Sequence, residues 1–236
     1  MDDHAIITHR RAVLAVLGLG GLFLPFAARA QLGGLGLGGG FTGLLGHASD
    51  NALDKLSQPG AFYNDQSIRI LLPLVAGGGL GGILGDVMNM GDKLGVTDGI
   101  TRTINDAAGK AAHAAKPVFR TAISRLTISD VPGIVGQGDG ATQYLKRSAG
   151  DQLAVQVRPL IDRALGNAGA YRQLDRLNRS SKLVSAAGLT HDKLGHSVTE
   201  QAMNGIFKYM GGEERALRAN PLGPAGSLLK GVMGGG

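Results

Sequence analysis

The chain has 236 residues, and 43% of them are apolar, which is enough to bury the core of one ordinary domain. It contains no cysteine, which excludes disulfides, thiolate metal sites and cysteine nucleophiles. Aromatic residues make up only 4%, which argues against a broad stacking surface for nucleic acid, and the formal net charge of +6 favours anionic partners in general.

The N-terminus has the three parts of a secretory signal. Arg10 and Arg11 precede the apolar run 12–28, which ends in the small-x-small pattern Ala28-Arg29-Ala30. Glycines and a proline interrupt this run, so it is too short and not apolar enough for a permanent membrane span. We expect residues 1–30 to be removed after Ala30 and the mature protein to be periplasmic. The paired arginines favour the twin-arginine route, with the general secretory route as the alternative.

Glycine and leucine dominate residues 31–48. Glycine disfavours helix and strand alike, so this segment is predicted to be a flexible linker between the signal and a helical domain over residues 49–236. The leucines and Phe41 leave a contact with a membrane surface open. The last residues of the domain are predicted to be a short tail.

The first predicted elements of the domain are a short helix and an extended segment. Ser49 is suited to cap a helix over residues 50–56, which the turn at Pro59-Gly60 would end. Residues 68–75 form an apolar run, but Pro73 lacks the N–H that a strand ladder needs. We therefore expect an extended, buried connection there.

Helical periodicity is clearer further along the chain. Apolar residues recur at intervals of three and four over 119–126, after Pro117, which suits a first helical turn. They recur over 153–164, where Pro159 is expected to bend the helix, and again over 202–209. No segment has the repeated alternation of a β-sheet. The sequence therefore predicts an all-α protein, with a single bundle of about seven or eight helices behind a signal peptide and a glycine-rich linker.

The glycine-rich segment 136–140 is expected to be a turn between two helices, with Asp139 as the cap of the second helix. The alternative is a small polar ligand pocket. Its candidate residues are Asp139, Thr142 and Tyr144, with Lys116 or Gln143 contributing.

The segment from Lys146 to Lys182 is strongly basic, with eight basic residues against three acidic ones. Arg172, Arg176 and Arg179 fall on one face of a helix. This face suits anionic lipid headgroups or envelope polysaccharide, with an ordinary solvated face as the alternative. Nucleic acid is disfavoured as a partner by the expected compartment.

Two motifs carry weak signals for a cofactor or a metal. The segment 77–82 matches a dinucleotide-binding fingerprint, yet no βαβ unit surrounds it, and no cofactor is expected. Asp192, His196 and Glu200 are four residues apart on one helix face, but no HExxH motif occurs. We expect a solvated polar face there and no metal site.

Two adjacent carboxylates near the C-terminus, Glu213 and Glu214, are expected to begin a helix. Glu214 is spaced for an ion pair with Arg218, one turn later. The chain has no G-x-S-x-G motif and no S-x-x-K motif with its usual companions, so no catalytic residue is predicted.

Several short motifs, in order, resemble a known family. They are Leu56-Ser57-Gln58-Pro59-Gly60-Ala61-Phe62, Asn105 with Ala107-Ala108, Lys116-Pro117-Val118-Phe119, Gly138-Asp139-Gly140-Ala141-Thr142-Gln143-Tyr144, Gly205-Ile206-Phe207, and Glu213-Glu214 ahead of Leu217-Arg218-Ala219-Asn220-Pro221. Together they are similar to the bacterial domain-of-unknown-function 4197 family, which consists of exported proteins with a helical body. The similarity covers roughly Leu53 to Met233. It implies a location and a fold, and it implies no activity.

These observations favour a non-catalytic binding or structural protein of the periplasm or cell envelope, which contacts anionic surfaces through the basic helix face, including Lys182. The alternative is a small enzyme with a polar cleft around Asp139, Thr142 and Tyr144. A subunit of a helical assembly is a third reading, and the oligomeric state stays open.

Overall fold

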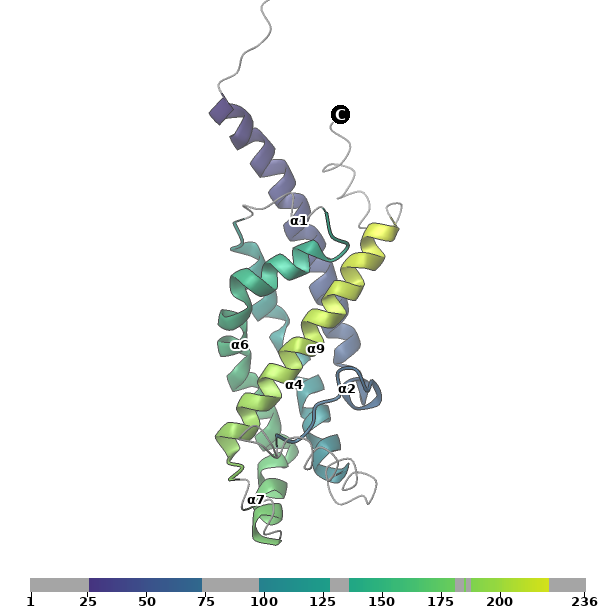
Figure 1. Cartoon of the computed structure of the whole chain (residues 1–236), viewed down its shortest axis with the longest axis vertical. Coiled ribbons are helices and arrows are strands. Elements are labelled where there is room, and N and C mark those ends of the chain that lie inside the picture. Colours follow the sequence, from purple (N-terminus) through teal and green to yellow (C-terminus); the bar gives the residue numbers. More distant parts are fainter. Residues whose placement is uncertain (1–25, 74–97, 128–135, 181–184, 186–187, 221–236) are drawn as a thin grey trace, which may run out of the picture.

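The computed structural model describes residues 26–73, 98–127, 136–180, 185 and 188–220 (Figure 1). These residues form six α-helices and no strand, which confirms the predicted all-α class, although seven or eight helices were expected. The helices are α1 (Phe26–Leu56), α2 (Ala61–Asn64), α4 (Asp98–Ser124), α6 (Gly140–Ala168), α7 (Ala170–Ser180) and α9 (His191–Ala219). Most of the predicted signal, the glycine motif at 77–82, Lys182 and the predicted C-terminal tail from 221 lie outside the described residues.

The prediction of a linker over residues 31–48 is wrong, because these residues belong to the continuous helix α1. The side chains of Phe41, Leu44, Leu45 and Ala48 are buried in the core, so Phe41 is not a surface contact. Their spacing of three and four is helical, and their burial outweighs the cost of up to about 1 kcal/mol for each glycine in a helix. The surrounding glycines hid this stripe.

Ser49 does not cap a separate helix over residues 50–56. It lies inside α1, fully buried, and within the described residues its Oγ has no hydrogen-bond partner. The predicted helix is the last part of α1. The same core stripe continues through Ala52, Leu53 and Leu56, which explains why the chain does not break at Ser49.

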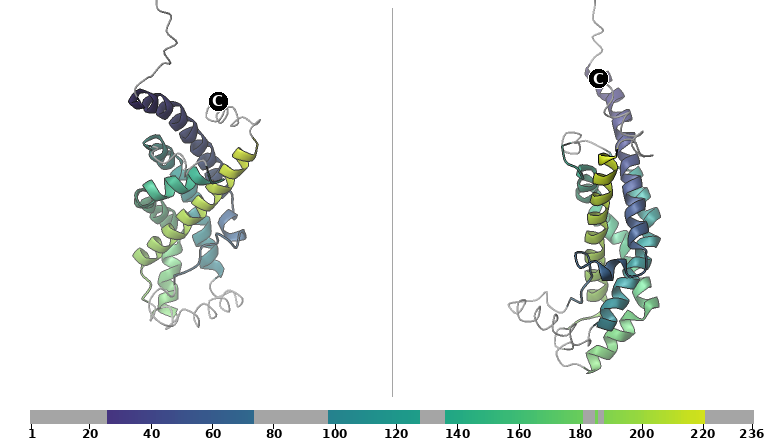
Figure 2. Two further views of the ribbon diagram at one scale, coloured as in Figure 1. Left: turned by 45° about the horizontal axis from the view of Figure 1, so that its top comes forward. Right: turned by 90° about the vertical axis from the view of Figure 1, so that its right-hand side faces the viewer.

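Helix α4 is the central element and contacts α1, α2, α6, α7 and α9. Its inward face is a run of small side chains, which lets neighbouring helices approach closely. The buried members are Ala107, Ala108, Ala111, Ala112 and Ala115. The bundle is elongated: α1 extends beyond it at one end, and α7 lies at the other (Figure 1, Figure 2).

Both prolines expected to start or bend a helix lie inside continuous helices. Pro117 is in the interior of α4 rather than in its first turn, and Pro159 is in the interior of α6. A proline removes one helical hydrogen bond, at a cost of about 3 kcal/mol. Buried neighbours on each side, such as Ala115 and Phe119 around Pro117, hold the two halves of α4 in one packed helix.

The expected connection is confirmed as a segment without helix or strand over residues 69–73; Ile68 lies in the preceding turn, and 74 and 75 lie outside the described residues. Ile68, Ile70 and Leu72 are buried. The backbone N–H of Ile70 donates to Asn105 Oδ1 at 2.9 Å, and Asn105 Nδ2 donates to the Ile70 carbonyl at 2.8 Å. On the next residue, Gln201 of α9 makes the same pair of bonds with Leu71, both at 2.9 Å. Two side-chain amides thus take the place of neighbouring strands.

Within the described ranges, no helix combines the length and the apolarity that a membrane crossing requires.

Candidate functional site

The residues of the predicted polar pocket do not converge. Asp139 occupies the N-cap position of α6, but its side chain makes no capping bond and instead pairs with Arg215 of α9 at 2.5 Å. Thr142 is fully buried. The hydroxyl of Tyr144 donates to the Thr127 carbonyl at 2.7 Å.

Of the two remaining pocket candidates, one pairs with another helix and the other belongs to the first turn of α6 itself. Lys116 pairs with Asp54 of α1, and the backbone N–H of Gln143 donates to the Asp139 carbonyl within the first turn of α6. The surface hollow between α4 and α6 and the groove between α6 and α9 are lined by other residues. Neither of these two hollows therefore supports the enzyme reading.

A residue that the sequence did not single out for this role, Glu214, caps α6 from another helix. Its carboxylate is fully buried and accepts the backbone N–H of Ala141 at 3.0 Å and of Thr142 at 2.7 Å. The predicted pair with Arg218 is confirmed, with bonds of 2.9 and 2.6 Å to Oε1. The prediction that Glu213 and Glu214 begin a helix is wrong, because both lie late in α9.

The basic residues of α7 do share one surface. Arg172, Arg176 and Arg179 are exposed and spaced four and three apart, which places them on one side of the helix. The opposite side buries Ala170 and Leu174 against the bundle. We call the three arginines the α7 basic face. Lys182, the fourth predicted member, lies outside the described residues.

The α7 basic face lacks the ion pairs that neutralise other arginines of the protein. Arg120 pairs with Asp50, Arg158 with Asp162 and Arg215 with Asp139. By contrast, no carboxylate of the described residues lies within ion-pair distance of Arg172, Arg176 or Arg179. Their charges are available to a partner.

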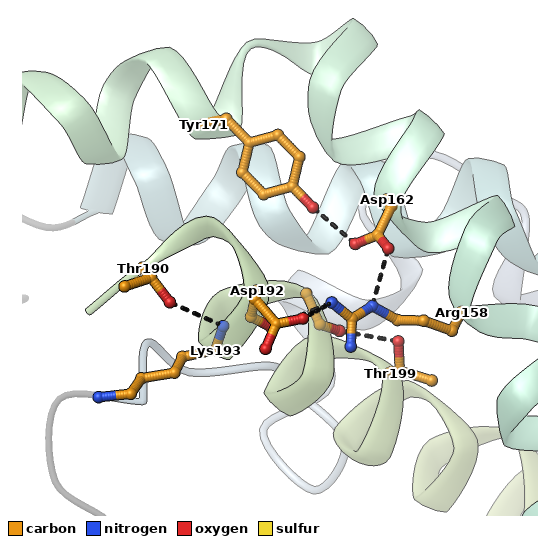
Figure 3. Close-up of polar contacts among 8 residues, drawn as sticks. Arg158, Asp162, Tyr171, Thr190, Asp192, Lys193 and Thr199 are labelled. Carbon is orange, nitrogen blue, oxygen red and sulfur yellow. Dashed lines mark hydrogen bonds and ion pairs between the residues drawn. The ribbon is translucent and has the colours of Figure 1, made fainter. Parts of the chain in front are cut away.

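A polar network fixes α7 to α6 and to the start of α9 (Figure 3). Tyr171 of α7 donates to Asp162 Oδ1 at 2.6 Å, and Arg158 Nε donates to Asp162 Oδ2 at 2.8 Å. Arg158 also reaches the Asp192 carboxylate at 3.0 Å. Burial, and then the bond to Asp162, raise the pKa of Tyr171 well above its ordinary value of 10, so its hydroxyl stays protonated as the donor.

A second contact on the same helix involves His191, the first residue of α9. Its ring stacks on Tyr171 with centroids 4.5 Å apart, and its Nε2 lies 2.8 Å from Asp175 Oδ1. Helix α7 is therefore held at two points along its length, at Tyr171 by Asp162 and at Asp175 by His191. The α7 basic face is therefore presented by a fixed helix.

Gly195 allows the network to approach α9. A Cβ atom at this position would overlap Asp162 Oδ1 and lie 2.9 Å from Arg158 Nη2. Overpacking of this kind costs about 1–3 kcal/mol, more than the roughly 1 kcal/mol that alanine gains over glycine in a helix. We expect Gly195→Ala to lower the free energy of unfolding by about 1 kcal/mol, measured by urea denaturation.

The matched control for Gly195→Ala is Gly46→Ala in α1, where a Cβ would meet no atom within 4 Å. This change should raise the free energy of unfolding by up to about 1 kcal/mol through helix propensity alone. Equal, stabilising effects at both positions would mean that the network tolerates a methyl group at Gly195.

The two carboxylates and the histidine expected on one face of α9 do not share one partner. Asp192 binds Arg158, and His196 lies 3.4 Å from Glu200 on the exposed surface. No three His, Cys, Asp or Glu side chains of the described residues are grouped as metal ligands would be.

Comparison with known proteins gives one result. The family model described as "Protein of unknown function (DUF4197)" matches residues 35–234. No curated protein and no solved structure matches the chain.

Proposed function

The chain belongs to the DUF4197 family, whose description assigns no activity, so we propose its function from its own geometry. We propose a non-catalytic helical binding protein of the cell envelope that contacts anionic surfaces, in the first place lipid headgroups, through the α7 basic face. The single observation that carries this proposal is that three exposed arginines, without carboxylate partners among the described residues, share one face of α7.

The expected strength of this contact follows from its charge. Each arginine or lysine near an anionic membrane contributes about 1 kcal/mol, so the α7 basic face should contribute about 3 kcal/mol. That corresponds to roughly a hundredfold in affinity. Arginine also presents its donors in a planar fork that matches a phosphate group. The bonds from Tyr171 and His191 support the proposal, because a fixed helix loses little conformational freedom on binding.

The proposal is tested by co-sedimentation of the protein with vesicles of neutral phosphatidylcholine, with and without anionic phosphatidylglycerol. We expect binding to the anionic vesicles that weakens as salt is added. Replacing Arg172, Arg176 and Arg179 with glutamine together should lower the affinity by roughly a hundredfold.

A second triple variant controls for net charge. Lys110, Arg125 and Arg147 are also exposed and have no carboxylate partner in the described part of the chain, so their replacement with glutamine removes the same charge elsewhere. It should change the affinity by less than about tenfold. Equal binding to neutral and anionic vesicles, or equal losses in the two triple variants, would reject the proposal. Retained binding to an acidic envelope polysaccharide, with no binding to vesicles, would replace lipid as the partner.

Export is the other part of the proposal, and it rests on the signal-like N-terminus. Cell fractionation should find a shortened chain in the periplasm. Replacing Arg10 and Arg11 with lysine should block export by the twin-arginine route and leave the general secretory route working. A full-length chain in the cytosol of wild-type cells would contradict export by either route.

A further inference from the structure

Helices α6 and α9 run antiparallel, and a groove of about 670 Å³ lies between them. Its floor is apolar: Met203 and Phe207 of α9 line it, with 5% and 6% of their surface exposed. On the α6 side, Gly150 and Ala154 are too small to fill the space. The size falls within the range of about 300–1,000 Å³ that is usual for small-molecule sites.

Gly150 is the residue that keeps the groove open. A Cβ atom there would have Lys146 Cγ at 3.8 Å and Phe207 Cε2 at 4.0 Å as its nearest neighbours, so it would fit without a clash. A larger side chain would extend into the groove and fill it. The glycine is therefore not required by helix packing.

The rim of the groove is unusually apolar at one point. Val155, which lines it, is 74% exposed; among the described residues the other exposed large apolar side chain is Leu71, at 47%. An apolar ligand lying along the floor would remove Val155, Met203 and Phe207 from water, and each buried CH₂ contributes roughly 0.8 kcal/mol.

The charges along the groove are unevenly placed. Lys146 lies at one end, where its Nζ is 3.2 Å from Asn204 Oδ1 and 5.7 Å from the centroid of the Phe207 ring. Within the described residues it has no carboxylate partner. Arg158, at the other end, is already neutralised by Asp162 and Asp192.

The carboxylates that line the groove repel an acidic group from its middle. Asp151 and Glu200 are both exposed there. His196 also lines the groove, but it lies 3.4 Å from Glu200, so an acidic ligand group is attracted most to the Lys146 end. From Lys146 to Arg158 the groove runs along twelve residues of α6, which is about 18 Å.

We propose that this groove binds a single-chain amphiphile, with the apolar chain along Met203 and Phe207 and an acidic head at Lys146. The site is separate from the α7 basic face and does not depend on the function proposed for it. The groove has a long apolar floor and one cation without a carboxylate partner at its end. A fatty acid matches both features, with its chain and its carboxylate.

The experiment uses the full chain and a fluorescent fatty acid, displaced by dodecanoate or by dodecanol below their micelle-forming concentrations. We expect saturable binding, with dodecanoate displacing the probe better than dodecanol. Gly150→Leu should weaken probe binding at least tenfold. It should not lower the unfolding midpoint, because leucine is a better helix former than glycine.

The matched control for the filled groove is Gly212→Leu in α9, where a Cβ meets no atom within 4 Å. It makes the same chemical change outside the groove and should bind the probe as the wild type does. If Gly150→Leu does not fold, Ala154→Leu, one turn further along α6, fills the groove from the same side.

The head-group assignment is tested by Lys146→Gln. This change should weaken dodecanoate binding several-fold and leave dodecanol binding unchanged, while Arg147→Gln should alter neither. The triple glutamine variant of the α7 basic face should bind the probe normally, which separates this site from vesicle binding. No saturable binding by the wild type, normal binding by both filled variants, or equal effects of Lys146→Gln on acid and alcohol would overturn the proposal.

Discussion

Replacing Glu214 with alanine is expected to lower the free energy of unfolding by about 3 kcal/mol, which is a large part of the stability of a domain of this size. The Glu214 carboxylate is fully buried and accepts the N–H groups of Ala141 and Thr142 in the first turn of α6. It also neutralises Arg218, whose side chain is only 18% exposed. Alanine would leave two buried helix donors without an acceptor and would remove the buried carboxylate with which Arg218 pairs. Urea denaturation measures the change.

Two variants separate the cap from the charge. Glu214→Gln keeps the shape and one acceptor oxygen, so its loss should be about half as large. Glu213→Ala removes the neighbouring carboxylate, which pairs with Lys55 at 2.5 Å. Because the Lys55 side chain is 60% exposed, this loss should stay below about 1 kcal/mol. A loss at Glu214 no larger than that at Glu213 would show that α6 does not need its buried cap.

The second large effect is expected at Asn105. Its amide makes hydrogen bonds with both backbone groups of Ile70, and its Nδ2 also donates to the Thr101 carbonyl at 2.7 Å. Asn105 and Ile70 are both buried, so water cannot replace these bonds. Each unsatisfied buried polar group costs about 1–3 kcal/mol, and we expect Asn105→Ala to lower the free energy of unfolding by about 2–3 kcal/mol.

Gln201 provides the matched control for Asn105. It makes the same pair of bonds with the neighbouring residue Leu71, but that residue is 47% exposed. Water can satisfy these backbone groups, so Gln201→Ala should cost about 0.5–1 kcal/mol. Asn51→Ala, on the exposed side of α1, should change stability by less than about 0.5 kcal/mol. If Asn105→Ala and Gln201→Ala have equal effects, burial is not the reason for the cost at Asn105.

The helices and faces that local spacing predicted are present. The stripe of Leu153, Val157, Ile161 and Ala164 is buried along α6, and the arginines of α7 lie together on its exposed side. Both predictions succeed because residues three and four apart share a face of any α-helix, whatever the rest of the chain does. The α7 basic face is therefore the part of the candidate site that the sequence could predict.

The prediction for α1 failed because propensity and burial oppose each other there. Counting glycines over residues 31–48 indicates a linker, whereas Phe41, Leu44 and Leu45 find buried positions that only the assembled bundle provides. Propensity and burial also oppose each other at Pro117. The helical hydrogen bond lost at this proline is outweighed by the buried side chains on both sides of it in α4.

The amino-acid sequence by itself determined that this protein is helical and which faces of α6, α7 and α9 are apolar or basic, since helical periodicity is a property of neighbouring residues. Only the tertiary structure decided that Glu214 caps α6. Its carboxylate accepts the N–H of Ala141, which lies 73 residues earlier in the sequence. The tertiary structure alone placed Lys146 at the end of a groove floored by Phe207. These arrangements depend on which helices pack together, and that choice minimises the free energy of the whole core rather than of any one segment.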